Sequence, residues 1–233
     1  LSNAAATQSV QAYDFTAPTV ATALLGLPGP TTTANITFSE PVAINLNGIS
    51  MAVDQHVISG GGTGLSFSPA VGSLSAIRTI TGAATSTADS IVKLTYDASA
   101  GQISDASGNA MNSLELYIGG NGNNIIDLST YKSTFQQMLL GNSGADTLTG
   151  TRSGDVLVDG ADADTLKGSR GADTIRLVEN GGSTPYSQDV VVVKPGDSTR
   201  TSMDVVTGFD TFSTDPAKHD VLDLTSAQIV AVG

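Results

Sequence analysis

The chain has 233 residues and a formal net charge of −12, with 22 acidic and 10 basic side chains. This balance argues against nucleic acid and against an anionic membrane surface as partners, because each needs a basic patch, and it suits a protein that collects cations. No apolar run approaches the roughly 20 residues of a membrane span, so membrane insertion is not expected. The absence of cysteine excludes disulfides, thiolate catalysis and zinc–cysteine sites. The 26 glycines, together with 39% apolar residues, predict an all-β fold of short strands and tight turns around a buried core.

Residues 14–118 contain short runs in which polar and apolar side chains alternate, separated by turn signals. Such alternation is typical of half-buried strands, and its clearest instances are 35–38, 42–46, 91–96 and 114–118. Short antiparallel strands over about 100 residues indicate an immunoglobulin-like β-sandwich. Residues 1–13 before it are expected to be a tail or linker.

Three pieces of this segment resemble bacterial immunoglobulin-like repeats of long surface proteins, and they are 14–18, 38–42 and 103–110. In such modules the acidic residues at strand ends sometimes hold a calcium ion. The matching positions here are Asp14, Glu40 and Asp105. The alternative interpretation is that these three are ordinary turn residues.

From Gly141 to Arg176 the chain repeats with a period of nine, in four unbroken copies. The sixth position of every copy is aspartate, and these residues are Asp146, Asp155, Asp164 and Asp173. The eighth position is always aliphatic, and these residues are Leu148, Leu157, Leu166 and Ile175. Repetition at a fixed period, with both positions filled each time, indicates a stacked repeat architecture.

Each copy reads as a glycine-rich turn that leads into a short strand. Side chains alternate along a strand, so the aspartate and the aliphatic residue point to the same, inner side. Stacked turns would bring the carboxylates together, where they repel one another unless a cation lies between them. Calcium suits this place, because it takes about six to eight oxygens from carboxylates and backbone carbonyls. Glycines at positions one and four allow the turn its left-handed backbone, and these are Gly141, Gly144, Gly150, Gly168 and Gly171.

The nonapeptide resembles the repeats-in-toxin (RTX) family, whose consensus is Gly-Gly-x-Gly-x-Asp-x-aliphatic-x. The resemblance implies a parallel β-roll with two nonapeptides in each coil and with calcium between turns one coil apart. It therefore implies that Asp146 pairs with Asp164, and Asp155 with Asp173. A degenerate copy within the connecting segment 119–140 fits if Asn124 replaces the aspartate.

Several positions depart from the consensus and leave the number of occupied sites open. In the third copy Asp159 stands at position one and Asp162 at position four, while Arg152 and Arg170 occupy position three elsewhere. We expect the extra acidic residues to make the Asp146–Asp164 stack the tighter site. The alternative is a metal-free roll held by its aliphatic stack alone.

Residues 141–233 are interpreted as the roll and its cap. The pieces that resemble closing strands of secreted RTX proteins are 188–193, 203–210 and 219–224. Solvated turn residues are favoured over a further ion site at Asp204, Asp210 and Asp220. The spacing of large apolar residues in 130–140 predicts one short helix.

These features predict a non-enzymatic, calcium-binding module of a large secreted or cell-surface bacterial protein. An adhesin or surface-layer protein exported by type I secretion fits best, with calcium driving folding outside the cell. We expect a monomeric piece of a longer protein, with a cell-surface or carbohydrate ligand and with two halves that unfold separately. The alternatives are the accessory calcium-binding end of a secreted hydrolase or toxin, and a carbohydrate-binding module.

Overall fold

A computed structural model describes residues 14–26, 31–44, 49–53, 56–59, 65–70, 72–82, 86–87, 89–178, 187–210 and 219–224. Throughout these ranges the regular structure is β-strand, which confirms the predicted all-β fold. The expected tail at 1–13 and the end of the expected cap at 225–233 lie outside them. The described residues contain no helix that is long and apolar enough to cross a membrane.

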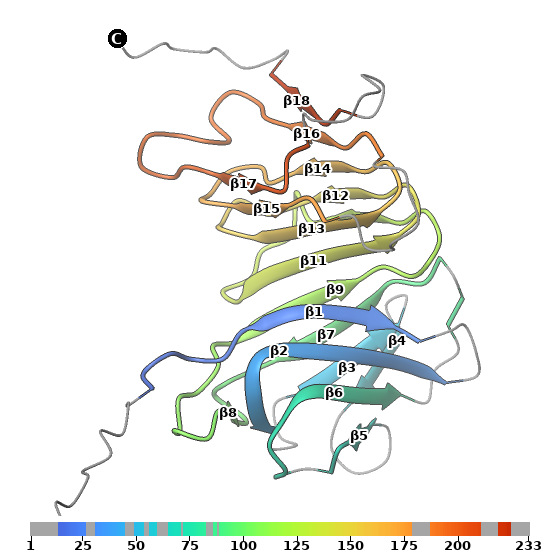
Figure 1. Cartoon of the computed structure of the whole chain (residues 1–233), viewed down its shortest axis with the longest axis vertical. Helices are drawn as coiled ribbons and strands as arrows, with labels where there is room; N and C mark the ends of the chain where they lie inside the picture. Colours follow the sequence, from blue (N-terminus) through green and yellow to red (C-terminus); the bar gives the residue numbers. More distant parts are fainter. Residues whose placement is uncertain are drawn as a thin grey trace, which may run out of the picture.

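The N-terminal half contains an antiparallel sheet in the order β1-β2-β6-β5. Its strands are β1 (Val20–Leu25), β2 (Thr32–Ile44), β5 (Leu65–Ser68) and β6 (Ser75–Gly82), and the short β8 (Ile103–Ser104) also pairs with β2. The sequence predicts a break at Ser39-Glu40-Pro41, but β2 continues through it and curves strongly (Figure 1). Its register with β6 shifts between Thr37 and Val42, because proline has no N–H for the ladder and such a residue is accommodated by a bulge.

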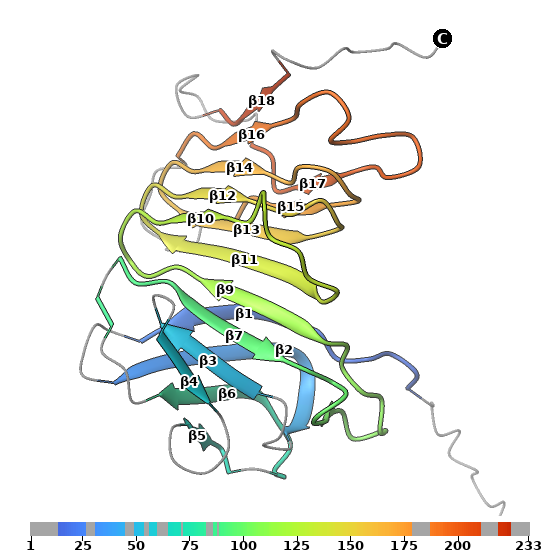
Figure 2. The same ribbon diagram turned by 180° about the vertical axis from the view of Figure 1, so that it is seen from behind.

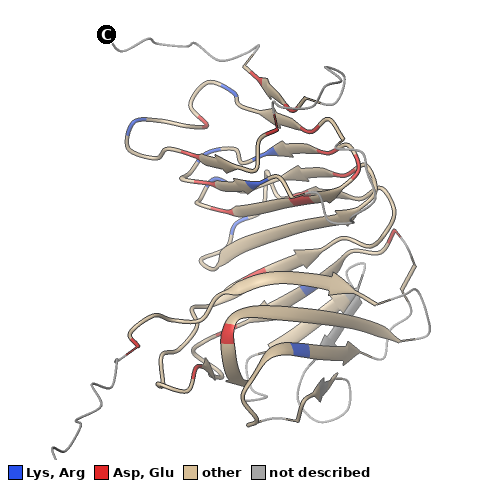
Figure 3. Ribbon diagram, viewed as in Figure 1, with Lys and Arg blue, Asp and Glu red and all other residues tan. Residues whose placement is uncertain are grey.

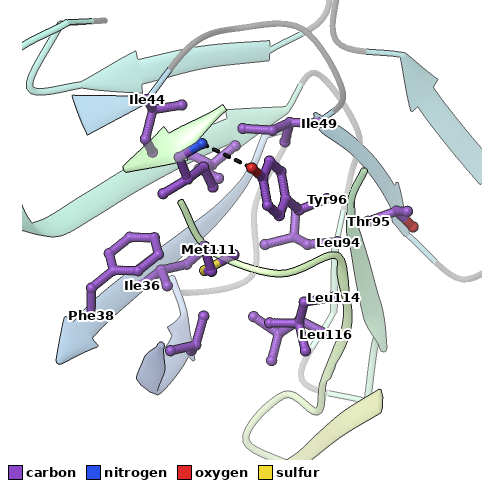
Figure 4. Close-up of a pocket in the computed structure, with 13 residues that line it drawn as sticks. Ile36, Phe38, Ile44, Ile49, Leu94, Thr95, Tyr96, Met111, Leu114 and Leu116 are labelled. Carbon is purple, nitrogen blue, oxygen red and sulfur yellow. Dashed lines mark hydrogen bonds between the residues drawn. The ribbon is translucent and has the colours of Figure 1, made fainter. Parts of the chain in front are cut away.

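The second sheet of this half has the order β4-β3-β7-β9. Its antiparallel strands are β3 (Ile49–Val53), β4 (His56–Ser59), β7 (Val92–Tyr96) and β9 (Leu114–Ile118). Buried side chains of both sheets form one core, part of which Figure 4 shows around Ile36, Phe38 and Leu94. The backbone N–H of Ile103 donates to the Tyr96 hydroxyl at 2.9 Å. We call this pair of facing sheets the sandwich.

From β9 onward the chain winds as a coil whose strands alternate between two sheets (Figure 2). One sheet holds β10 (Ile125–Asp127), β12 (Thr147–Thr149), β14 (Thr165–Lys167), β16 (Val190–Val192) and β18 (Val221–Asp223). The other holds β11 (Gln136–Ser143), β13 (Val156–Ala161), β15 (Thr174–Arg176) and β17 (Val205–Thr207). Parallel pairing of Thr147 with Thr165 joins residues two nonapeptides apart. This confirms a β-roll with two repeats in each coil, and we call β10–β18 the roll.

The sandwich and the roll share one continuous eight-stranded sheet. Strand β9 pairs antiparallel with β7 on one edge and parallel with β11 on the other. The roll residues Met138, Leu140 and Val158 belong to the same buried cluster as the sandwich core. The domain boundary that the sequence predicts between residues 118 and 119 therefore falls at the end of β9, a strand that pairs with both halves.

The short helix predicted in 130–140 is wrong, because this segment enters strand β11. Met138 and Leu140 pack against the sandwich core, while Leu139 between them packs inside the roll. A strand buried on both faces has a continuous apolar run without alternation. Its pattern therefore could not be distinguished from that of a buried helix.

A polar cluster joins the sandwich to the loop between β10 and β11. The Lys93 ammonium lies 2.5 Å from Oε1 of Glu115 and donates to the Tyr131 hydroxyl at 2.8 Å. The Tyr131 hydroxyl in turn donates to the same Glu115 oxygen at 2.9 Å. Lys93 also lies 5.3 Å from the centroid of the Tyr117 ring, a distance at which a cation is attracted to the ring face.

We expect Lys93→Met to lower the free energy of unfolding by about 3 kcal/mol, because it leaves the buried Glu115 carboxylate without its counter-charge. Urea denaturation of the calcium-loaded chain measures the loss. Tyr131→Phe is the matched control, since it removes one hydroxyl and should cost about 1 kcal/mol. Equal stability of Lys93→Met and the parent chain would show that this ion pair does not hold the junction together.

Candidate metal centre

The aspartates at position six form two ladders, one at each edge of the roll where turn meets strand. Figure 3 shows acidic residues gathered at the turns on both edges of the coil. From the strand register, one ladder contains Asn124, Asp146, Asp164, Asp189 and Asp220. The other contains Asp155, Asp173 and Asp204. The structure thus brings together both pairs that the RTX resemblance implied.

Each ladder is held by a hydrogen bond from the backbone of one aspartate to the carboxylate one coil further on. The N–H of Asp146 donates to Oδ1 of Asp164 at 2.7 Å, and that of Asp155 to Oδ1 of Asp173 at 2.8 Å. The same contact joins Asp164 to Asp189 at 2.9 Å. One oxygen of Asp164 and one of Asp173 are therefore used to stack the coils, and the second oxygen of each remains for another partner.

The aliphatic residues at position eight fill the interior between the two sheets. Leu148, Leu157, Leu166 and Ile175 are fully buried in one cluster that runs along the roll. Neighbouring coils extend this cluster with Ile126, Leu139 and Val191. The core fixes the register of each strand, and the register in turn places every aspartate above the next.

Glycine at position one leaves the space into which oxygens converge. A Cβ on Gly150 would lie 2.6 Å from the backbone oxygen of Gly168 and 2.7 Å from Oδ2 of Asp155. A Cβ on Gly141 would likewise collide with Oδ2 of Asp146 and with the backbone oxygen of Asp159. These two turns thus each bring together a carboxylate oxygen of their own and a carbonyl oxygen from the next coil, which are the ligands that a hard cation prefers.

In three of these aspartates the second carboxylate oxygen has no hydrogen-bond partner in the protein. Oδ2 of Asp146, Asp164 and Asp173 is buried and accepts no hydrogen bond. Burial, together with the repulsion of neighbouring carboxylates, raises the pKa of Asp146 to about 6, that of Asp173 to about 7 and that of Asp164 to about 9. A divalent cation beside these oxygens would remove both the desolvation and the repulsion. The residues present therefore fit a bound cation.

Comparison with protein-family models matches residues 140–175 to the RTX calcium-binding nonapeptide repeat, in four copies. Residues 140–175 are RTX repeats. The match spans the four turns from Gly141 to Asp173, and RTX repeats bind calcium ions, so calcium is the cation of this roll. Neither the search of curated proteins nor the search of solved structures found a match.

The second RTX repeat differs from the other three. Asn142, Gly160 and Ser169 at position two have positive φ angles of 75°, 128° and 75°, whereas Thr151 does not adopt this conformation. Thr151 instead donates to Oδ2 of Asp155, from its N–H at 2.5 Å and from its hydroxyl at 2.9 Å. The Asp155 carboxylate is thus satisfied within its own turn, unlike those of the other RTX aspartates.

The degenerate copy at 119–127 stacks on the RTX repeats, because β10 pairs in parallel with β12. Its Asn124 takes the ladder position, and its N–H donates to Oδ1 of Asp146 at 2.6 Å. The Asn124 side chain donates to the backbone oxygen of Asp89 at 3.1 Å. An amide here ends the charged ladder on the side of the sandwich.

Sequence reasoning missed that the ladders continue beyond the RTX repeats. Asp189, Asp204 and Asp220 each take a ladder position, and Asp220 is buried rather than solvated. The signal was present as aspartate followed two residues later by Val191, Val206 or Leu222. Insertions between the strands break the period of nine and hide it.

The structure also brings together the three candidates of the sandwich. One carboxylate oxygen from each of Asp14, Glu40 and Asp105 lies within 4.8 Å of the other two. Oδ1 of Asp105 accepts the N–H groups of Ser107 and Asn109, each at 2.8 Å. Asp105 therefore closes its own turn, which favours the interpretation of a turn residue at this position.

Proposed function

We propose that this chain is a non-enzymatic, calcium-dependent folding module of a large secreted bacterial protein. RTX repeat proteins are typically secreted by bacteria. The observation that supports the proposal most directly is the set of buried Oδ2 atoms on Asp146, Asp164 and Asp173, which the protein itself leaves unsatisfied. Without calcium the ionised ladders repel. Filling the sites outside the cell would therefore order the roll after export.

The order of the strands in the sandwich supports a place in a cell-surface protein such as an adhesin. The sheets β1-β2-β6-β5 and β9-β7-β3-β4 correspond in order to A-B-E-D and G-F-C-C′ of an immunoglobulin-like domain. A domain of this type would act as a spacer that carries the roll. Type I secretion and attachment at the cell surface belong to this proposal.

Titration of the metal-free chain with calcium, followed by circular dichroism, tests the proposal. We expect β-structure to increase in the range of about 0.1–1 mM calcium that extracellular modules need, and magnesium at equal concentration to have a much smaller effect. Asp146→Asn and Asp173→Asn should shift the titration to higher calcium. Asp89→Asn, at an exposed position outside the ladders, is the matched control.

An identical spectrum with and without calcium would refute the proposal. So would an equal shift for Asp89→Asn and Asp146→Asn, because the response would then depend on total charge rather than on the ladders.

A further inference from the structure

Three buried carboxylates meet at the end of the matched RTX repeats. One oxygen from each of Asp159, Asp164 and Asp189 lies within 4.8 Å of the other two. All three residues are at most 2% exposed. Asp189 lies outside the matched residues 140–175 and after a long insertion, so this place is not one of the stacked pairs that the repeat period predicts.

Asp159 stands where the RTX consensus has glycine, and it contributes to two neighbouring coils. Its backbone oxygen lies on the side of Gly141 and Asp146. Its carboxylate lies on the opposite side, where Oδ1 accepts the N–H of Gly160 at 2.5 Å and that of Val178 at 2.7 Å. These two hydrogen bonds hold the side chain toward the coil that contains Asp189.

Asp164 provides a second observation that points to a ligand. Its Oδ1 accepts the N–H of Asp146, whereas its Oδ2 is buried without a hydrogen-bond partner. The negative charges of Asp146, Asp189 and Asp159 all act on this carboxylate. A cation among the three clustered carboxylates would satisfy the remaining oxygen and cancel the repulsion.

We propose that Asp159, Asp164 and Asp189 form a three-carboxylate calcium site, and that it is the tightest site of the roll. This inference rests on the proposed function, that calcium orders the roll. Calcium affinity rises with the number of charged ligands in a site, and the stacked RTX pairs have two carboxylates each. The sequence suggested that Asp159 strengthens the Asp146–Asp164 stack, whereas its carboxylate lies with Asp164 and Asp189 and outside any such group with Asp146.

The site would also fasten the C-terminal coils to the RTX repeats. The ladder continues from Asp189 to Asp220, whose Oδ1 accepts the N–H of Asp189 at 3.1 Å. Strands β16 and β18 are therefore aligned through the residue that completes the site. Calcium bound here would order these strands together with β14.

The test is calorimetric titration of the full metal-free chain with calcium, alone and with Asp159→Asn. The amide keeps an oxygen for the two backbone N–H groups and removes the charge, so we expect the tightest phase to weaken about tenfold or more while the others persist. Asp89→Asn is the matched control, because Asp89 is exposed and lies outside the cluster and outside both ladders. It should leave the tightest phase within about twofold of the parent value.

Circular dichroism at saturating calcium shows whether each variant folds, and Asp189→Asn provides an independent removal of the third carboxylate. Loss of the tightest phase in both Asp159→Asn and Asp189→Asn, but not in Asp89→Asn, supports the site. An unchanged tightest phase in Asp159→Asn overturns the inference while leaving the proposed function intact. Absence of any calcium binding by the parent chain overturns the proposed function itself.

Discussion

At pH 8, where the ladders are most ionised, removal of calcium is expected to disorder the roll and to lower the melting temperature of the sandwich as well. For each site with a dissociation constant of about 0.1–1 mM, about 5 mM calcium stabilises the folded state by roughly 1–2 kcal/mol. Several sites act on the same stack, so their contributions accumulate. Chelation reverses this stabilisation and leaves buried carboxylates facing one another in both ladders.

The sandwich should respond because it shares β9 with the roll. Disorder of β11 and β13 would leave one edge of β9 unpaired. It would also remove Met138, Leu140 and Val158, which belong to these two strands, from the sandwich core. Burial of such side chains contributes about 1.5–3 kcal/mol each. The sandwich in the metal-free chain therefore loses an edge partner and part of its core cover.

Differential scanning calorimetry with and without a chelator measures this coupling. We expect one transition in calcium, and after chelation a roll that no longer melts cooperatively beside a sandwich whose melting temperature has fallen. Two separate transitions, with a melting temperature of the sandwich that chelation does not change, would instead support the two independently unfolding halves expected from the sequence. Magnesium added back to the chelated chain is the control for ionic strength.

The roll could be predicted from the sequence because each of its contacts recurs with the period. The period of nine places an aspartate at the same point of every turn, and Leu148 two positions after Asp146 indicates what fills the interior. The two-repeat coil itself was implied by the RTX resemblance and not by the spacing, and the parallel pairing of Thr147 with Thr165 confirms it. The same logic identifies Asn124 as a ladder residue.

The junction could not be predicted, because each half has a complete local pattern of its own. Nothing in the alternation of Leu114–Ile118 indicates that both edges of the strand are paired. The burial of Met138 and Leu139 on opposite faces of β11 removed the alternation that would have identified a strand. Pairing between distant segments therefore decided the structure where the local pattern was ambiguous.

The three-carboxylate cluster was hidden for a different reason. A repeat alignment places Asp159 in a column but does not tell on which side of the turn its carboxylate lies. The backbone N–H groups of Gly160 and Val178 decide that direction. The partner Asp189 lies after an insertion, so the period of nine does not reach it.

Without calcium, the chain is expected to be more stable at pH 5 than at pH 8. Burial raises the pKa of Asp146, Asp173 and Asp164 in the folded chain to about 6, 7 and 9, from an ordinary value of 3.8. At pH 5 the folded ladders keep protons that the unfolded chain has lost, and such a difference favours the folded state. This stabilisation is complete below pH 4 and is lost as pH rises toward about 9. The expected loss between pH 5 and pH 8 is on the order of a few kcal/mol.

Calcium should reverse this pH dependence, because protons and calcium compete for the same carboxylates. Urea denaturation at pH 5 and pH 8 measures both cases, once in metal-free buffer and once in calcium. Asp164→Asn should flatten the metal-free dependence most, since its amide cannot titrate and the pKa of Asp164 is the most strongly raised of the three. The carboxylates whose pKa is lowered, such as Asp97 and Asp127, are ionised in both states over this range and contribute little to the slope. A metal-free chain that gains stability from pH 5 to pH 8 would show that the ladders are hydrated and ionised before calcium binds.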